Sequence, residues 1–219
     1  MYEKQKKELA ELCHRLYERG LAAACDGNVS MRVSETHILL TPSGRNKGLV
    51  RAEEMLVLDL AGNPVEGTGR ASKEYPMHRV IYGGRADVNA VVHTHPVYAT
   101  AFALAGKNIP ENCLIETRMV LKSVRLAGYA TPGTAELAEA VRPCLPGCGA
   151  ILLKNHGAVT LGKDPEDAFN KMEALESVAK TVLLSRILGE PEVISEENMK
   201  KMESVRAART VPGKEEGTP

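Results

Sequence analysis

The 219-residue chain has no tryptophan, only two phenylalanines and no net charge, because 28 basic residues balance 28 acidic ones. The balanced charge excludes the broad basic surface with which proteins bind nucleic acid or an anionic membrane. No apolar run reaches the length of about 20 residues that a membrane-spanning helix needs. The charged opening MYEKQKKELAEL also lacks the apolar core of a signal peptide. Apolar residues still make up 43% of the chain, which predicts a soluble protein with a hydrophobic core.

Cysteine is scarce and odd in number, with five residues at positions 13, 25, 113, 144 and 148. An odd count without a signal peptide predicts reduced thiols and a cytoplasmic location. The only close pair is Cys144 and Cys148, which flanks Pro146 and Gly147. A single close pair among proline and glycine is more typical of a turn than of a metal site.

Hydrophobic periodicity predicts helices alternating with strands. The expected helices cover residues 3–19, 74–83, 96–105, 134–141 and 165–188, and the last has Asp164 as N-cap and Pro165 at its first position. The expected strands follow the turn at 26–27 and cover 37–41, 55–60, 88–95 and 150–153. This order predicts an α/β protein, a single three-layer α/β/α sandwich around a largely antiparallel sheet. We expect one domain over residues 1–190 and a C-terminal tail over 191–219, partly helical and then flexible.

The segment Val91-Val92-His93-Thr94-His95 carries the clearest chemical signal. Side chains two apart on a strand point to the same face, so His93 and His95 can bind one ion together. His156, in the segment KNHG, is the best candidate for a third ligand. Three nitrogen ligands leave one position open, which is the pattern of a catalytic zinc site.

Other readings of these residues stay open. His14, His37 and His78 could also be ligands, and His78 lies one helical turn after Glu74. Glu74 follows a loop at the start of a helix, and a carboxylate beside a divalent ion is either a ligand or a base. An exposed glutamate at a helix start is also common without any function.

Three loops are rich in small residues and hydrogen-bond donors. They are Asp26-Gly27-Asn28, Thr41-Pro42-Ser43-Gly44 and Ala71-Ser72-Lys73-Glu74. Hydroxyls, free backbone N–H groups, a lysine and a helix N-terminus together can form a phosphate site. None of the loops matches a nucleotide-binding motif, and each alone is typical of an ordinary turn. The prediction of a phosphate site therefore depends on the three loops lying together.

Six motifs occur in the order found in class II sugar-phosphate aldolases, and they span about residues 5–190. They are GNVSMR (27–32), TPSG (41–44), SKE (72–74), AVVHTHP (90–96), YATPGT (129–134) and LLKNHG (152–157). Each motif is weak alone, but jointly they are specific. The chain thus resembles the L-fuculose-1-phosphate aldolase family, which is related to ribulose-phosphate 4-epimerases and to the adducin head domain.

The resemblance implies a site and an assembly. It implies zinc on His93, His95 and His156, with Glu74 as a resting ligand that moves off to act as base. It implies phosphate binding at Gly27, Asn28, Ser43, Gly44 and Ser72, and Lys73 could add a point charge. The metal could also be Mn²⁺ or Co²⁺. The expected partners are a small phosphorylated sugar and further copies of the chain, in a C4 homotetramer with active sites at subunit interfaces. Nucleic acid and membrane are not expected partners.

The implied activity is reversible cleavage of a ketose 1-phosphate to dihydroxyacetone phosphate and a small aldehyde, through a metal-bound enediolate. A 4-epimerase or a sugar-acid phosphate decarboxylase would use the same chemistry, and a metal-free scaffold like the adducin head is a further alternative. Epimerases carry aspartate where this chain has Glu74, which favours aldolase, and the scaffold lacks the three ligands. The chain departs from the family at Cys25, Lys73 and Leu114, where threonine, serine and a catalytic tyrosine are usual.

Overall fold

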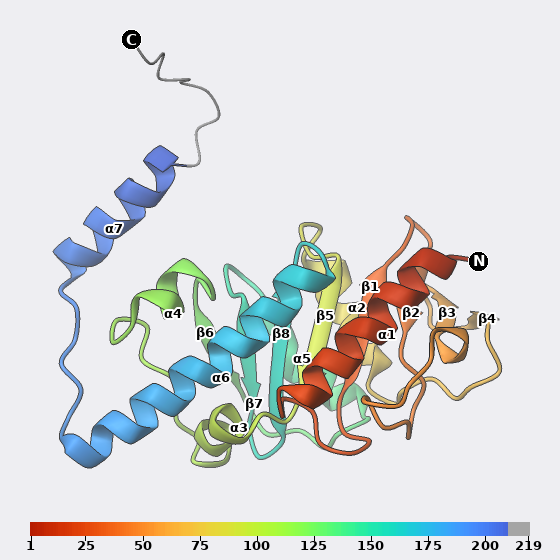
Figure 1. Cartoon of the computed structure of the whole chain (residues 1–219), viewed down its shortest axis with the longest axis horizontal. Helices are drawn as coiled ribbons and strands as arrows, with labels where there is room; N and C mark the ends of the chain where they lie inside the picture. Colours follow the sequence, from red (N-terminus) through yellow and green to blue (C-terminus); the bar gives the residue numbers. More distant parts are fainter. Residues whose placement is uncertain (210–219) are drawn as a thin grey trace, which may run out of the picture.

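Eight strands form one sheet, in the order β4-β3-β2-β1-β5-β8-β7-β6, in a computed structural model that describes residues 1–209 (Figure 1). All neighbouring strands are antiparallel except β6 and β7, which are parallel. The prediction of a largely antiparallel sheet is therefore confirmed. The strands are β1 (Asn28–Arg32), β2 (His37–Leu40), β3 (Leu56–Asp59), β4 (Pro64–Glu66), β5 (Ala90–Thr94), β6 (Val124–Ala127), β7 (Ala150–Leu153) and β8 (Gly157–Gly162).

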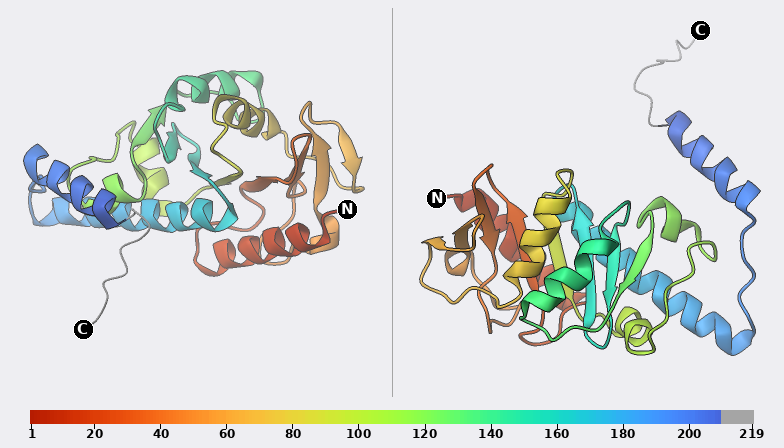
Figure 2. Two further views of the ribbon diagram at one scale, coloured as in Figure 1. Left: turned by 90° about the horizontal axis from the view of Figure 1, so that it is seen from above. Right: turned by 180° about the vertical axis from the view of Figure 1, so that it is seen from behind.

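Helices cover both faces of this sheet, which gives the predicted three-layer sandwich (Figure 2). One face packs against α1, α3 and α6, and the other packs against α2 and α5. Two short 3₁₀ turns lie at Ala52–Glu54 and Arg142–Cys144. The helices are α1 (Glu3–Glu18), α2 (Tyr75–Gly84), α3 (Val97–Leu104), α4 (Ile115–Met119), α5 (Ala135–Val141), α6 (Pro165–Leu188) and α7 (Glu196–Arg209).

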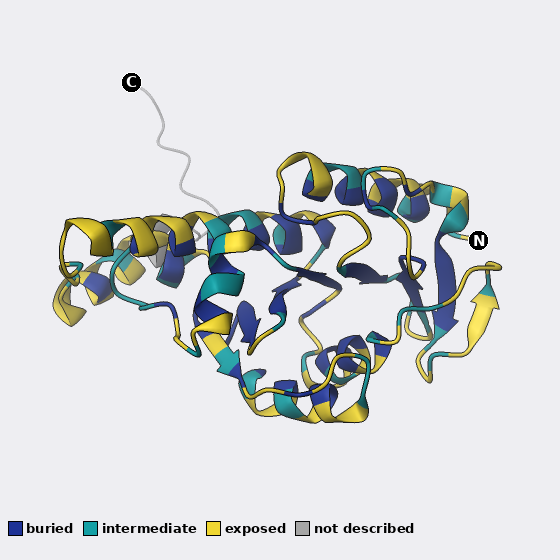
Figure 3. Cartoon of the chain, turned by 90° about the horizontal axis from the view of Figure 1, so that it is seen from below, coloured by how far each residue is buried: buried dark blue, intermediate teal, exposed yellow. Residues whose placement is uncertain are grey.

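The alternation of side chains along β5 decides which face of the sheet carries its histidine. Val92 packs in the core between the sheet and α1, α3 and α6, whereas Val91 packs in the core beneath α2 and α5. His93 is two residues from Val91, so its side chain lies on the α2 face. The strands are largely buried except at the two edge strands, β4 and β6, and the exposed residues lie mostly on the outer sides of the helices and in loops (Figure 3).

The long helix α6 has the boundaries that the sequence predicts. The side chain of Asp164 accepts a hydrogen bond from the backbone N–H of Asp167 at 2.8 Å, and Pro165 is the first helical residue. The helix ends before Gly189, and its last residue, Leu188, is 92% exposed. Within residues 1–209, no helix combines the length and the apolar character needed to cross a membrane.

The region predicted as a tail begins after α6 and contains α7. Arg118 in α4 donates to Glu203 of α7 at 2.8 Å, which links the helix to the rest of the chain. The predicted flexible end falls, for positions 210–219, outside the described residues.

Several sequence predictions of elements were wrong. The strand expected over 88–95 is shorter, so His95 lies just beyond the end of β5. The sequence patterns also did not predict β4, β6, β8 and α4. The strand β8 begins at a glycine, Gly157. A Cβ atom at Gly157 would overlap the ring of His95, so glycine allows a close approach there.

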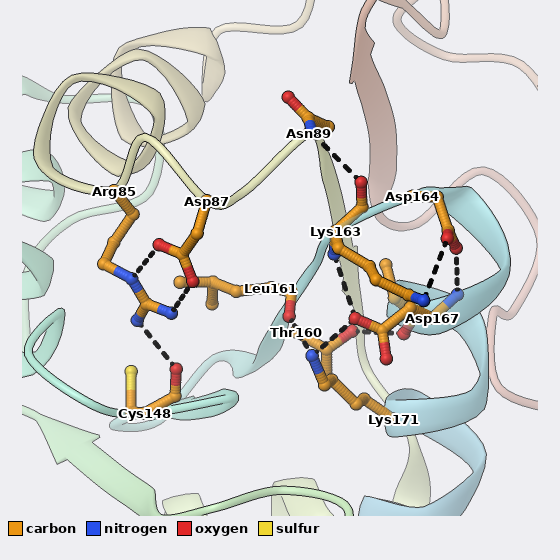
Figure 4. A network of polar contacts seen from close by, with 11 residues as sticks. Arg85, Asp87, Asn89, Cys148, Thr160, Leu161, Lys163, Asp164, Asp167 and Lys171 are labelled. Atoms are coloured by element: carbon orange, nitrogen blue, oxygen red, sulfur yellow. Dashed lines mark hydrogen bonds and ion pairs between the residues drawn. The ribbon is translucent and has the colours of Figure 1, made fainter. Parts of the chain in front are cut away.

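A network of polar contacts lies at the start of β5, at the end opposite to the histidines (Figure 4). Arg85 pairs with Asp87 through two hydrogen bonds of 2.7 and 2.8 Å, and Asn89 donates to the carbonyl of Lys163 at 3.1 Å. Across a cavity of about 360 Å³, Lys171 donates to the carbonyl of Leu161 at the end of β8. The bond from Asn89 to Lys163 joins the start of β5 to the end of β8.

Candidate metal centre and active site

Three histidine side chains converge at one end of the interior strands β5 and β8. His93 is the penultimate residue of β5, His95 lies just beyond that strand, and His156 lies in the turn between β7 and β8. The antiparallel pairing of β5 with β8 brings these segments together, with Thr94 opposite Ala158. Nε2 of His95 lies 3.3 Å from Nε2 of His93, and each pair of ring centroids is 4.8 to 5.0 Å apart. One ring nitrogen from each residue lies within 4.8 Å of the others, so the group could hold a metal ion.

The carboxylate of Glu74 faces the same point from the N-cap position of α2. Its Oε2 atom lies 3.2 Å from Nε2 of His93, and its Oε1 atom lies 3.3 Å from Nε2 of His156. Asn28 Nδ2 donates to Oε2 at 2.8 Å. Burial raises the pKa of this carboxyl, but hydrogen bonding and charge interactions with His93, His156 and Asn28 outweigh burial and lower the pKa to about 2. Glu74 is therefore ionised at neutral pH.

The hydrogen bonds around the histidines fit a cation. Nδ1–H of His93 donates to the carbonyl oxygen of Ala158 at 2.9 Å, which leaves the lone pair on Nε2. Nδ1 of His95 lies 3.7 Å from Oδ2 of Asp26, and its Nε2 faces Nε2 of His93. The buried Oε1 of Glu74 accepts no hydrogen bond among the described residues. Several acceptors thus face one another, and a shared proton or a bound cation must lie between them.

Burial disfavours the protonated forms of His95 and His156. It lowers the pKa of His156 to about 4, with a further contribution from the neighbouring His93. Burial and His93 also lower the pKa of His95. Neutral imidazoles are the form that binds metal. The donor set of three imidazole nitrogens and one carboxylate is typical of zinc and of related divalent ions.

The three donor-rich loops lie together beside the histidines. Pro42 forms an isolated antiparallel bridge with Ala71, and Ser43 N–H donates to the carbonyl of Arg70 at 2.8 Å. Asn28 Nδ2 also lies 3.1 Å from Oγ of Ser72, which joins the first loop to the third. The prediction of a phosphate site requires the three loops to be neighbours. In the structure they are neighbours.

The predicted anion-binding residues differ in exposure. Asn28 is buried, Gly27 and Ser72 are half-buried, and Ser43, Gly44 and Lys73 are exposed. Gly27 has φ of +75°, and a Cβ atom there would overlap the carbonyl oxygen of His93. The first loop therefore needs glycine to pass this close to β5.

Two of the alternative histidines lie away from this group. His14 Nε2 makes a hydrogen bond of 2.8 Å with the carbonyl of Val50, and His37 Nδ1 lies 2.9 Å from the hydroxyl of Tyr2. His78 instead contacts Asn28 and is fully buried. Leu114 packs against the core beneath α1, α3 and α6.

Sequence reasoning missed Lys47, whose exposure is only 1%. Its ammonium group donates to the carbonyls of Cys25 at 3.3 Å and Arg45 at 3.0 Å, so it ties the first loop to the second. Burial lowers the pKa of Lys47. A lysine in a polar loop carries no sequence signal of burial, so this link could not be predicted. All five cysteines, including Cys144 and Cys148, are free.

Comparison with known proteins agrees with this geometry. Residues 7–183 match the family described as the Class II Aldolase and Adducin N-terminal domain. The L-fuculose phosphate aldolase of Methanococcus maripaludis strain C7 is 40% identical over 78% of this chain and 91% of its own. The 3-oxo-tetronate 4-phosphate decarboxylase of Haemophilus influenzae is 33% identical over 80% of this chain and 85% of its own. A solved L-fuculose 1-phosphate aldolase superposes with a TM-score of 0.86 and 34% identity, covering 92% of this chain and 95% of that one.

The chain therefore belongs to the class II aldolase and adducin family. Within it, the match to fuculose phosphate aldolases identifies the chain as a class II aldolase, a lyase. Class II aldolases depend on a metal ion, and the three-histidine group is the place in the described chain where one could bind.

Proposed function

We propose that the protein reversibly cleaves a ketose 1-phosphate of the L-fuculose 1-phosphate kind into dihydroxyacetone phosphate and a small aldehyde. The observation that carries this proposal is the convergence of His93, His95 and His156 on the carboxylate of Glu74. Aldol chemistry needs an electrophile at the carbonyl, a base at the neighbouring carbon and an anchor for the phosphate. The names of the relatives, which include both aldolase and decarboxylase, support the chemistry more strongly than the particular sugar.

Zinc is the cofactor that we propose, one ion per subunit, with Mn²⁺ or Co²⁺ as alternatives. His93, His95 and His156 would hold it, and Glu74 would be a further ligand when no substrate is bound. Once bound, the ion would supply a Lewis acid that polarises the substrate carbonyl and stabilises negative charge on its oxygen.

Glu74 is the base in this proposal. In the synthetic direction its carboxylate would remove a proton from C3 of dihydroxyacetone phosphate, and in the cleavage direction it would return that proton. The low pKa keeps the carboxylate ionised, and the hydrogen bond from Asn28 orients Oε2. The buried Oε1 atom, on the side of His156, accepts no hydrogen bond among the described residues, which suits a carboxylate that changes partners.

The neighbouring loops would bind the phosphate. Their hydroxyls, backbone N–H groups and one ammonium group can neutralise a dianion without a broad basic surface. The residues that we assign to this role are Gly27, Asn28, Ser43, Gly44, Ser72 and Lys73.

The assembly, the cellular location and the domain bounds are further proposals. We propose a C4 homotetramer with active sites at subunit interfaces, because Ile187 and Leu188 at the end of α6 are 79% and 92% exposed. Light scattering after gel filtration measures the mass, and a monomer would contradict the proposal. We further propose a cytoplasmic location, a catalytic domain over residues 1–190, and a tail over 191–219.

Hydrogen exchange tests the proposed activity without a choice of aldehyde. Zinc-loaded protein is mixed with dihydroxyacetone phosphate in deuterated water, and the C3 hydrogens are followed by NMR. We expect stereospecific exchange that a chelator and the substitution Glu74→Gln abolish. Zinc-loaded protein without exchange would refute the aldolase. If exchange occurs, lactaldehyde, glycolaldehyde and acetaldehyde can be screened as second substrates.

A second candidate is a 4-epimerase or a sugar-acid phosphate decarboxylase. The decarboxylase of Haemophilus influenzae is similar over most of its length, and the exposed Lys73 adds a positive charge that suits an additional carboxylate. Release of CO₂ from a 3-oxo sugar-acid phosphate, with no exchange in dihydroxyacetone phosphate, would favour the decarboxylase. Interconversion of pentulose phosphates would favour the epimerase.

A further inference from the structure

A ladder of buried side chains connects α2 to β1 behind the candidate base. Glu74, His78 and Tyr82 are spaced four residues apart along α2, and Asn28 and Ser30 are spaced two apart along β1. Four residues of a helix rise about 6 Å and two residues of a strand rise about 6.6 Å, so the two rows can stay in step. Each strand residue of the ladder bonds two helix residues in turn.

The contacts form one continuous chain. Asn28 bonds Glu74 through Nδ2 at 2.8 Å, and its Oδ1 atom contacts Nε2 of His78. Nδ1 of His78 lies 2.7 Å from Oγ of Ser30, and Oγ lies 2.8 Å from the hydroxyl of Tyr82. His78 and Ser30 have no exposed surface. Buried polar groups of this kind need a partner for each proton, so the direction of every bond can be deduced.

The direction is set at Glu74, because an ionised carboxylate only accepts hydrogen bonds. The end of the Asn28 amide that faces Glu74 must therefore be the NH₂ group. The amide oxygen then faces His78 and requires a proton on Nε2 of that ring. A neutral imidazole carries one proton, so Nδ1 accepts from Ser30, and the Ser30 oxygen in turn accepts from Tyr82.

Burial supports each assignment. It lowers the pKa of His78 to about 3, with a further contribution from His93, so the ring is neutral over the physiological range. Burial also raises the pKa of Tyr82, so the hydroxyl keeps its proton. The four hydrogen bonds of the ladder can thus run in one direction only.

We propose that His78 is a positioning residue for Glu74, acting through Asn28. By donating from Nε2, His78 prevents the Asn28 amide from rotating and keeps its NH₂ group on Oε2 of Glu74. A rotated amide would present oxygen to a carboxylate oxygen, which repels the base from its place beside His93. The inference rests on the proposed function, in which Glu74 is base and ligand.

The tautomer of His78 is the first test, and it needs neither metal nor substrate. Long-range ¹H–¹⁵N spectra of the metal-free full-length protein at neutral pH should show the Nε2–H tautomer of His78, assigned by its absence in His78→Gln. The Nδ1–H tautomer, or a charged ring, would overturn the ladder. This result does not depend on whether the protein is an aldolase.

Two substitutions of His78 then distinguish a role in positioning Glu74 from a role in packing. Gln can donate an amide N–H to Asn28, whereas Leu fills similar space without a donor. We expect His78→Leu to lower both zinc affinity and kcat for deuterium exchange by about 10- to 100-fold, with KM for dihydroxyacetone phosphate little changed. We expect His78→Gln to restore most of both. Equal zinc affinity in the two variants would overturn the proposal.

A control on the same helix removes a different buried hydrogen bond. The hydroxyl of Tyr75 donates to the carbonyl of Asp59 at 3.0 Å and takes no part in the ladder. Tyr75→Phe should lower the melting temperature without changing zinc affinity. If it weakens zinc binding as much as His78→Leu does, the effect of His78 is one of general stability and the proposal fails. If wild-type protein exchanges no deuterium, the proposed function fails, while zinc affinity and the tautomer still decide the role of His78.

Discussion

One carboxylate oxygen of Glu74 lies 3.2 Å from Nε2 of His93, although Glu74 caps α2 and His93 lies near the end of β5. The contact joins a helix on one face of the sheet to a strand within it. Loss of the carboxylate would therefore remove the charged group that faces His93 from α2.

Replacement of Glu74 by Gln should abolish the exchange of C3 hydrogens. Gln has nearly the same shape but cannot take up the proton, and general base catalysis contributes about 10²- to 10⁴-fold. Exchange rates followed by NMR measure the loss, and circular dichroism verifies the fold. Glu35→Gln is a matched control, because Glu35 is an exposed glutamate in the turn after β1. A Glu74→Gln rate within a few-fold of wild type would remove the base from the proposal.

Replacement of a single histidine of the group should release the metal. His93→Ala, His95→Ala and His156→Ala each leave two imidazole nitrogens, too few for a tight site. We expect less than one zinc per chain after dialysis, as measured by elemental analysis. His14→Gln serves as control, since His14 bonds only the carbonyl of Val50 among the described contacts. Full zinc content and activity in His93→Ala would show that the ion binds elsewhere.

Replacement of Gly27 by Ala should damage the site through the backbone. The positive φ of Gly27 costs a side chain about 1–2 kcal/mol, and the new methyl group would also overlap the carbonyl of His93. Gly20 has a similar φ of +68° but nothing within 4 Å of the added atom. Gly20→Ala therefore reports the conformational cost alone. Calorimetry should show a distinctly larger fall in melting temperature for Gly27→Ala, and only that variant should lose zinc. Equal melting temperatures would contradict the overlap.

The stability of the metal-free protein should depend on pH through His78. The ordinary histidine pKa is about 6.5, and burial lowers that of His78 to about 3 in the folded state. Between these values the unfolded state binds the proton and the folded state does not. The free energy of unfolding should thus fall as the pH drops from about 6.5 towards 3, by up to about 1.4 kcal/mol per pH unit from this residue.

Urea unfolding of wild type and His78→Gln between pH 7 and pH 5 measures this contribution. The other titrating groups are the same in both proteins, so the difference in pH dependence belongs to His78. We expect the curve of the variant to be flatter. Parallel curves would mean that His78 takes up its proton in the folded state as readily as in the unfolded one.

The sequence predicted those parts of the fold whose signal is local. Asp164 and Pro165 determine where α6 begins, and both are recognisable from residue type alone. The strand β8 was missed because its first residue, Gly157, is usually a breaker. Its role depends on the ring of His95, which approaches it only in the folded chain.

In the candidate site too, local sequence patterns predicted some residues, whereas their arrangement depends on the folded chain. His93 and His95 were found from their spacing, and Glu74 was found with the help of family motifs. Their convergence with His156 depends on the pairing of β5 with β8, which no local pattern shows. The ladder of hydrogen bonds through His78 could not be predicted from the sequence, for another reason. It requires the register of α2 against β1, and that register is set by packing rather than by sequence spacing.

The site residues come from distant parts of the chain, so metal binding would also affect the stability of the folded protein. An ion held by Glu74, His93 and His156 would act as a cross-link between α2, β5 and the turn before β8, and it would bind the folded state alone. Each tenfold rise in free metal above the dissociation constant would then stabilise that state by about 1.4 kcal/mol. In a cell short of metal, the unfolded fraction and its loss to proteases would grow. Scarcity would therefore reduce the number of enzyme molecules as well as their turnover.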